Sequence, residues 1–203
     1  METAELADLI RRAQRRDPAA FDALVEAYNA RLYGYFYRLT GSRHDAEDLL
    51  QEVFVRLVRM IDQYEHKDRF DGWLFRVATN LARDRVRRAR RTAGLHAQAV
   101  SAEVGPLDEL ADPAVDQPGR TVERAEQCDR LQWALGQLPE AERQVILLRH
   151  FSQMAFREIA EVMDTPLGTA LARAHRGLAR LRKMMTAGDD RGDYHGDTET
   201  RRE

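Results

Sequence analysis

The stretch DGWLFRVATNLARDRVRRARR, residues 71 to 91, changes along one helical repeat from aromatic and apolar to densely cationic. One face of the predicted helix carries Trp73, Leu74, Val77, Ala78, Leu81, Ala82, Arg85 and Val86. The other face carries Arg76, Asn80, Arg83, Arg87, Arg88, Arg90 and Arg91. Six arginines fall within the last nine residues, and such a helix end repels itself unless a polyanion is near. The pattern indicates nucleic-acid contact, although a solvated helix end would also carry cations that complement the helix dipole.

The composition limits the class of protein. The chain has 203 residues and a formal net charge of -2, but residues 165–187 contain basic side chains and no acid. Because 33% of the residues are charged, we expect two small helical domains rather than one large core. Cys128 is the single cysteine and cannot form an internal disulfide. No signal peptide and no membrane-spanning apolar run are recognisable, which predicts a soluble, cytoplasmic protein without membrane insertion.

Three helices are predicted before the opening stretch. The first covers residues 2–15, and the second starts with Asp17 as N-cap and Pro18 at its first position and ends at Gly41. Ser42 starts the third helix. Its apolar stripe lies opposite an acidic and amide patch flanked by valines: Asp45, Asp48, Gln51, Glu52, Val55 and Val58. The helix dipole explains acids in the first turn but not the valines, so a docking surface for a basic partner is the alternative.

The segment between Ile61 and Asp71 has no sustained period and is predicted to be a loop, with Asp71 as N-cap of the following helix. It carries Tyr64 and Phe70. An aromatic loop beside an arginine-rich helix is typical of proteins that stack unpaired bases while cations hold the phosphates. The alternative is that both rings pin the loop to the core.

Residues 93–120 are rich in proline, glycine and acids and are predicted to be a linker. Helices follow at 121–138 and 139–151. The segments MAFREIAEVM (154–163) and GTALARAHRGLARLRKMM (168–185) predict a helix-turn-helix whose second helix enters the major groove. The candidate contact residues of that helix are Thr169, Arg173, His175, Arg176 and Arg180. An ordinary helical hairpin with a solvated basic face is the alternative. Residues 187–203 are expected to be disordered.

No catalytic or metal-binding pattern is present in the sequence. The six histidines are scattered, Cys128 has acidic neighbours, and no glycine-rich phosphate-binding turn occurs. We therefore expect no enzymatic activity, no metal and no cofactor.

Four ordered blocks resemble a known family: DAEDLLQEVFVRL (45–57), DGWLFRVATNLARDRVRRARR (71–91), LPEAERQVILLRHF (138–151) and FREIAEVMDTPLGTALARAHRGLARLR (156–182). In order and spacing they are similar to regions two and four of the extracytoplasmic-function sigma factors of bacterial RNA polymerase. The resemblance covers most of residues 17–185 and implies an all-α chain. The implied parts are a region two domain (1–92), a linker (93–120), a region four helix-turn-helix domain (121–186) and a tail (187–203).

The resemblance also implies partners and site residues. Members of the family bind core RNA polymerase and recognise promoter DNA; the partner surfaces are the clamp helices of the largest subunit and the flap of the second largest. The residues that the resemblance assigns to polymerase binding are Asp45, Asp48, Leu49, Gln51, Glu52 and Phe54. Contacts with the minus ten strand fall to Tyr64, Phe70, Trp73, Arg76, Asn80, Arg83 and Arg87. The residues that the resemblance assigns to contacts with the minus thirty-five element are Thr169, Arg173, His175, Arg176 and Arg180. Whether an anti-sigma factor binds this chain stays open.

The chain departs from the family pattern at three places. Asp164 stands where a turn glycine is frequent, and Asp tolerates the left-handed conformation at some cost. Residues 170–173 are Ala-Leu-Ala-Arg instead of the usual Val-Lys-Ser-Arg, and Val58 replaces a frequent aromatic. Two rival functions follow: a helix-turn-helix regulator that binds DNA without polymerase, and a helical adaptor that binds polymerase without recognising a promoter.

Overall fold

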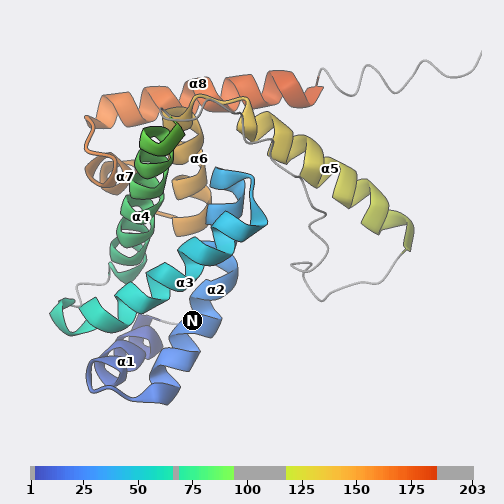
Figure 1. Cartoon of the computed structure of the whole chain (residues 1–203). Coiled ribbons are helices and arrows are strands. Elements are labelled where there is room, and N and C mark those ends of the chain that lie inside the picture. The colour runs from blue at the N-terminus through green and yellow to red at the C-terminus, as the bar shows by residue number, and fades with distance from the viewer. Residues whose placement is uncertain (1–2, 66–68, 94–117, 187–203) are drawn as a thin grey trace, which may run out of the picture.

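The computed structural model describes residues 3–65, 69–93 and 118–186, so most of the predicted linker and the whole predicted tail lie outside the described residues. Within those ranges the regular structure is helical, and the all-α prediction is confirmed (Figure 1). The elements are α1 (Thr3–Gln14), α2 (Pro18–Thr40), α3 (Arg43–Met60), a 3-10 turn (Ile61–Gln63), α4 (Phe70–Ala93), α5 (Pro118–Gly136), α6 (Glu140–Ser152), α7 (Phe156–Val162) and α8 (Leu167–Thr186).

Both ends of α2 form as the sequence predicts. The Asp17 side chain accepts a hydrogen bond from the backbone N–H of Ala19 at 3.0 Å, and Pro18 follows at the first helical position. Gly41 ends the helix in the left-handed conformation, with φ 71°, and its N–H donates to Tyr37 O at 2.8 Å. A residue with a Cβ would be strained there, so the helix stops at Gly41.

Of the next two helices, α3 begins at its predicted position and α4 begins two residues before its own. Ser42 is the N-cap of α3 and accepts from the N–H of Asp45 at 3.2 Å. Helix α4 starts at Phe70, one residue before the predicted cap, so the prediction of Asp71 as N-cap is wrong. Asp71 instead forms an ion pair with Arg31 of α2 at 2.8 Å.

Helices α1 to α4 enclose a core of large side chains. The largest residues that are fully buried there include Leu24, Leu32, Tyr35, Phe36, Leu49, Leu57, Phe70, Leu74 and Phe75. Burial of each such side chain contributes about 1.5 to 3 kcal/mol. The buried Tyr35 hydroxyl shares a hydrogen bond with Thr79 Oγ1 at 3.1 Å, and burial raises the pKa of Tyr35. This core fixes the face that α4 presents to solvent.

Helices α5 to α8 form the second bundle, which contains the predicted helix-turn-helix. Helices α7 and α8 are its two arms, and the turn between them includes Asp164 with φ 48°. The predicted left-handed conformation of Asp164 is therefore confirmed. Ala160 is 5% exposed and lies where α7 packs on its neighbours, as expected for a small residue at a close helix contact.

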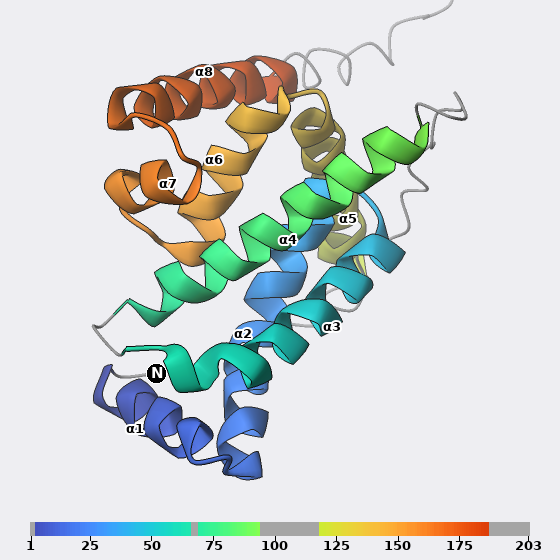
Figure 2. The ribbon, with the colours of Figure 1, turned by 60° about the vertical axis from the view of Figure 1, so that its left-hand side comes forward.

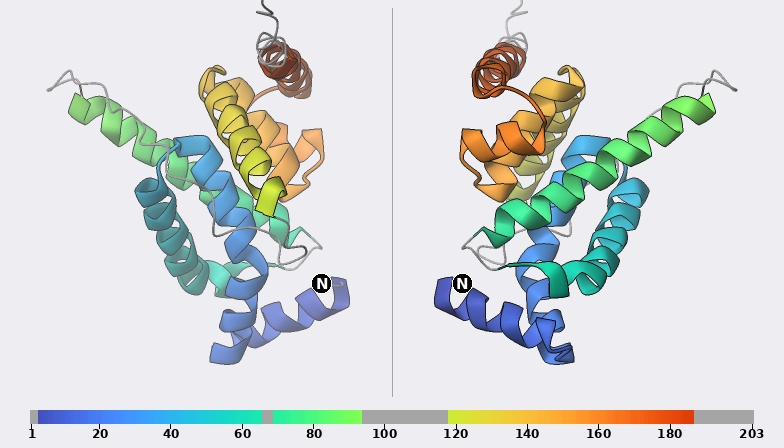
Figure 3. Two further views of the ribbon diagram at one scale, coloured as in Figure 1. Left: turned by 90° about the vertical axis from the view of Figure 1, so that its right-hand side faces the viewer. Right: turned by 90° about the vertical axis from the view of Figure 1, so that its left-hand side faces the viewer.

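The two bundles pack directly against each other (Figures 2 and 3). Helix α6 lies along α2, where a Cβ added to Gly34 would be 2.6 Å from Phe151 Cε1, and Arg31 Nε donates to Phe151 O at 2.9 Å. One cluster of buried apolar residues includes both bundles, whereas the composition predicted two separate small cores. The reason lies in α2, whose consecutive residues Tyr35, Phe36 and Tyr37 are all buried and cover more than half of its circumference.

Candidate protein and nucleic-acid interfaces

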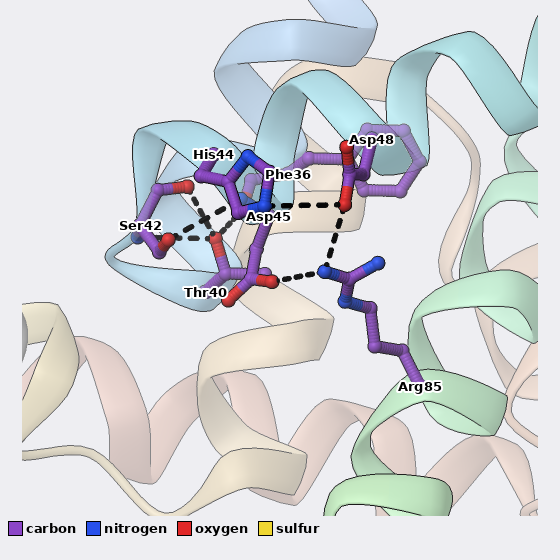
Figure 4. A network of polar contacts seen from close by, with 7 residues as sticks. All are labelled: Phe36, Thr40, Ser42, His44, Asp45, Asp48 and Arg85. Carbon is purple, nitrogen blue, oxygen red and sulfur yellow. Dashed lines mark hydrogen bonds and ion pairs between the residues drawn. The ribbon is translucent and has the colours of Figure 1, made fainter. Parts of the chain in front are cut away.

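The predicted acidic face of α3 is present, and Arg85 of α4 pairs with two of its carboxylates (Figure 4). One terminal nitrogen of Arg85 donates to Asp48 Oδ2 at 3.0 Å and also to Asp45. Burial alone would lower the pKa of Arg85, but its hydrogen bonds to both carboxylates raise the pKa overall. The three side chains stay 38% to 41% exposed. This network connects α3 to α4 and leaves both carboxylates accessible.

The rest of the acidic face follows along α3, where Gln51, Val55 and Val58 are exposed and Glu52 is partly exposed. We use the name acidic face for Asp45, Asp48, Gln51, Glu52, Val55 and Val58. Glu52 is 44% exposed and pairs with Arg56 at 2.9 Å, while Val55 and Val58 are 46% and 41% exposed. Leu49 was expected among the polymerase contacts, but it is 1% exposed and belongs to the core. Phe54 is half-buried against the same core. Carboxylates beside exposed valines suit a partner that is both basic and apolar.

Helix α4 presents a second surface, the cationic face, formed by Trp73, Arg76, Asn80, Arg83 and Arg87. Arg76, Asn80 and Arg87 are exposed, and Arg87 pairs with Asp84 at 2.7 Å. Trp73 is half-buried. These three side chains are therefore accessible to solvent, whereas Trp73 and Arg83 are partly covered.

The aromatic loop residues lie behind Trp73 and not beside it on the surface. Phe70 is 1% exposed and Tyr64 is 7% exposed, so the alternative that these rings pin the loop to the core describes the structure. Their ring centroids are 5.6 Å and 5.0 Å from that of Trp73. Gln14 Nε2 donates to Tyr64 O at 2.8 Å and holds the segment from the side of α1. The two rings therefore support Trp73, the one ring of the three with a partly open face.

A groove of about 430 Å³ lies over part of the cationic face, between α4 and α7. Trp73, Arg69 and Arg76 line one wall, and Glu158 and Glu161 line the other. Arg69 is 4.0 Å from Glu158. Farther along α4, Arg83 donates to Val162 O at 3.1 Å. In this arrangement the acids of α7 face the aromatic and cationic side chains of α4 across the groove.

Helix α8 carries the predicted basic surface of the helix-turn-helix. Thr169, Arg173, Arg176 and Arg180 are spaced by four, three and four residues, which places them on one face, named here the recognition stripe. His175 is exposed but lies on another face of the helix. The side chains of Arg176 and Arg180 are 55% and 51% exposed.

Sequence reasoning missed Glu142 of α6, which is buried under the recognition stripe. It accepts from Arg176 Nε at 3.2 Å and from Arg180 Nη1 at 2.6 Å, and its side chain is 7% exposed. Glu142 could have been found from its spacing. It lies three residues before the buried Val145, so the sequence places this acid on the apolar face of the helix. Two of the five predicted minus thirty-five residues are thus ion-paired inside the protein.

The second bundle also has an apolar groove of about 700 Å³, lined mainly by side chains of α5, α6 and α8. Its apolar lining includes Leu131, Leu135, Ile146, Leu178 and Leu181. Leu178 is 55% exposed. A groove of this size and lining can take one face of an apolar helix from another protein.

Comparison with known proteins gives consistent matches along the chain. Residues 24–92 match the family Sigma-70 region 2, and residues 128–181 match the family Sigma-70, region 4. The chain is 33% identical to the ECF RNA polymerase sigma factor SigW of Bacillus subtilis, over 87% of this chain and 94% of that protein. It is 32% identical to the RNA polymerase sigma-H factor of Pseudomonas aeruginosa, over 87% of this chain and 92% of that protein.

A solved structure shows the same fold. The sigma factor RpoE of Bartonella quintana, crystallised in complex with the anti-sigma factor NepR, aligns with a TM-score of 0.67. The alignment covers 82% of this chain and 96% of that chain, with 18% identity. Among the described residues of the present chain, no helix is both long enough and apolar enough to cross a membrane.

Proposed function

The chain belongs to the extracytoplasmic-function sigma factors, and we propose that its surfaces divide the contacts with polymerase and promoter among them. As a sigma factor it directs promoter-specific transcription initiation by RNA polymerase, and its family is not a family of enzymes. The main support for this division of contacts is that two neighbouring helices carry surfaces of opposite charge. The acidic face is on α3 and the cationic face is on α4, joined by Arg85.

The acidic face docks on the clamp helices of the largest polymerase subunit in this proposal. Gln51, Glu52, Val55 and Val58 carry the contact, because Arg85 partly neutralises Asp45 and Asp48. Leu49 does not contact polymerase in this proposal, because it is buried in the core that holds α3 in place. The apolar groove of the second bundle takes the polymerase flap, and an anti-sigma factor would compete for the same surfaces.

The cationic face holds the minus ten strand. Trp73 stacks on an unpaired base, Asn80 offers hydrogen bonds to a base edge, and Arg76 and Arg87 contact phosphates. Arg83 contacts a phosphate only after its hydrogen bond to Val162 O is broken. Because Glu158 and Glu161 also face Trp73 and Arg76, capture of the strand requires the second bundle to move away from α4. The proposed units are residues 1–92 and 121–186, connected by 93–120.

The recognition stripe contacts the minus thirty-five element. In a helix-turn-helix the first turns of the second helix contact base edges, which favours Thr169 and Arg173 for recognition and Arg176 and Arg180 for phosphates. His175 lies on another face of α8, so the proposal assigns it no base contact. Because promoter DNA is the target, we place the protein with the nucleoid in the cytoplasm.

Run-off transcription with core RNA polymerase tests the proposed function. Addition of the protein should give start-site-specific transcripts from some members of a promoter library. A self-sufficient helix-turn-helix regulator would bind its site tightly as the free protein and give no transcript. An adaptor would bind polymerase and also give none.

Replacing Glu52 with lysine should lower the affinity for core polymerase by about tenfold. The new cation would face the basic groups of the clamp, so repulsion replaces attraction at a partly exposed position. Binding of labelled protein to core polymerase measures the effect at two salt concentrations, because the loss should shrink at high salt. Glu26→Lys, an equal charge change at an exposed site on α2, is the control. Equal losses for both variants would rule out α3 as the specific docking helix.

A further inference from the structure

Glu142 is the only buried carboxylate among the described residues, and it forms ion pairs with two arginines of α8. A buried charge is costly unless it is paired and hydrogen-bonded. Here two arginines one helical turn apart, Arg176 and Arg180, supply charge-assisted hydrogen bonds to its two oxygens at 3.2 Å and 2.6 Å. The carboxylate therefore neutralises part of the recognition stripe from below.

The two arginines are only partly used by this contact. Glu142 binds one nitrogen of each guanidinium, which has five N–H donors. More than half of each arginine side chain stays exposed. The remaining donors can contact a phosphate while the carboxylate fixes the orientation of the planar group, as an outer partner orients a ligand in other sites.

A glycine brings the two helices close enough for this contact. A Cβ added to Gly177 of α8 would be 2.7 Å from Ile146 Cδ1 and 3.2 Å from Glu142 Cβ. Real Cβ atoms essentially never approach another atom as closely as the first distance. The absence of a side chain at Gly177 thus allows α8 to lie close to Ile146 and Glu142 of α6.

We propose that Glu142 is a positioning residue for promoter recognition: it orients Arg176 and Arg180 and removes positive charge that would otherwise bind any DNA. The inference rests on the proposed role of α8 at the minus thirty-five element. Its consequence is that recognition depends on Thr169 and Arg173, while Glu142 limits how strongly the rest of the stripe holds DNA of any sequence.

Glu142→Gln tests the proposal because glutamine keeps the size and one acceptor but loses the charge. The free variant should bind random duplex DNA several-fold more tightly at low salt, with a salt dependence steeper by about one unit of slope. In holoenzyme, the promoter ratio is the transcription from a promoter with an intact minus thirty-five element divided by that from a promoter with a substituted element. This ratio should be about tenfold smaller for Glu142→Gln than for wild type. Glu126→Gln, an exposed position on α5, is the charge-matched control.

Two other outcomes contradict the proposal. If binding to random duplex falls together with the melting temperature, Glu142 only holds α6 to α8. If neither the salt dependence nor the promoter ratio changes beyond the Glu126→Gln control, the two arginines do not face DNA. If wild type directs no specific transcript, the proposed function fails, and the random-duplex measurement still decides whether Glu142 limits non-specific binding.

Discussion

Start-site-specific transcription is expected to fall by about 10- to 100-fold when Trp73 is replaced with alanine. Stacking of one base on an aromatic ring is worth about 1 to 3 kcal/mol, and Trp73 is the partly open ring of its cluster. Tyr64 and Phe70 lie behind it and keep the ring in place, so little of the stacking energy is spent on ordering the side chain. Run-off transcription measures the loss.

Two controls separate stacking from general damage to the protein. Binding of the Trp73→Ala variant to core polymerase should stay within about twofold of wild type, because the acidic face is on α3. The matched variant Trp133→Ala removes the same ring from an exposed position on α5, 60% exposed, and should leave the minus ten step intact. If Trp73→Ala transcribes like Trp133→Ala, Trp73 serves the core and the minus ten strand is held elsewhere.

The second large effect concerns the contact between the bundles. The substitutions Gly34→Cys and Phe151→Cys, made together with Cys128→Ser, place one thiol on α2 and one on α6 where the helices are in contact. A short dimaleimide that joins them should reduce promoter-specific transcription to background. The joined helices would keep Glu158 and Glu161 beside Trp73 and Arg76, and Arg83 beside Val162. The minus ten strand would then be kept from Trp73 and Arg83, the two partly buried residues of the cationic face.

The same protein without the cross-linker is the control, and it should transcribe at least as well as wild type because removal of the Phe151 ring weakens the contact. Fluorescence energy transfer between the bundles should also show a larger separation in holoenzyme than in the free protein. If the cross-linked chain still gives full transcription, the minus ten strand reaches α4 with the bundles together, and the proposed opening is wrong.

Local features were predictable because each depends on a few consecutive residues. Asp17 and Pro18 start α2, Gly41 ends it in the left-handed conformation, and Asp164 takes positive φ in the turn before α8. The helix-turn-helix and the basic character of α8 follow from spacing and composition alone. The start of α4 was missed by two residues, because Asp71 pairs with Arg31 of another helix and does not cap its own.

Side-chain roles that depend on distant partners were not predictable. Tyr64 and Phe70 have the composition of a base-stacking loop, yet their rings fill the core behind Trp73. Leu49 is in the block that suggested polymerase contact, but helix packing turns it inward. The resemblance assigned residues by position along the chain, which places a residue on the correct helix and cannot say which neighbours cover it.

The sequence by itself determined the helices, the caps of α2 and the N-cap of α3, the helix-turn-helix and the opposite charges of α3 and α4, because these follow from periodicity and local backbone preference. Only the tertiary structure decided which of the charged groups are free to act. Arg85 bridges two acids of α3, and Glu142 lies beneath two arginines of α8. The partners in these pairs are 34 to 40 residues apart in the chain, so their contact arises from packing of whole helices, which no local pattern encodes.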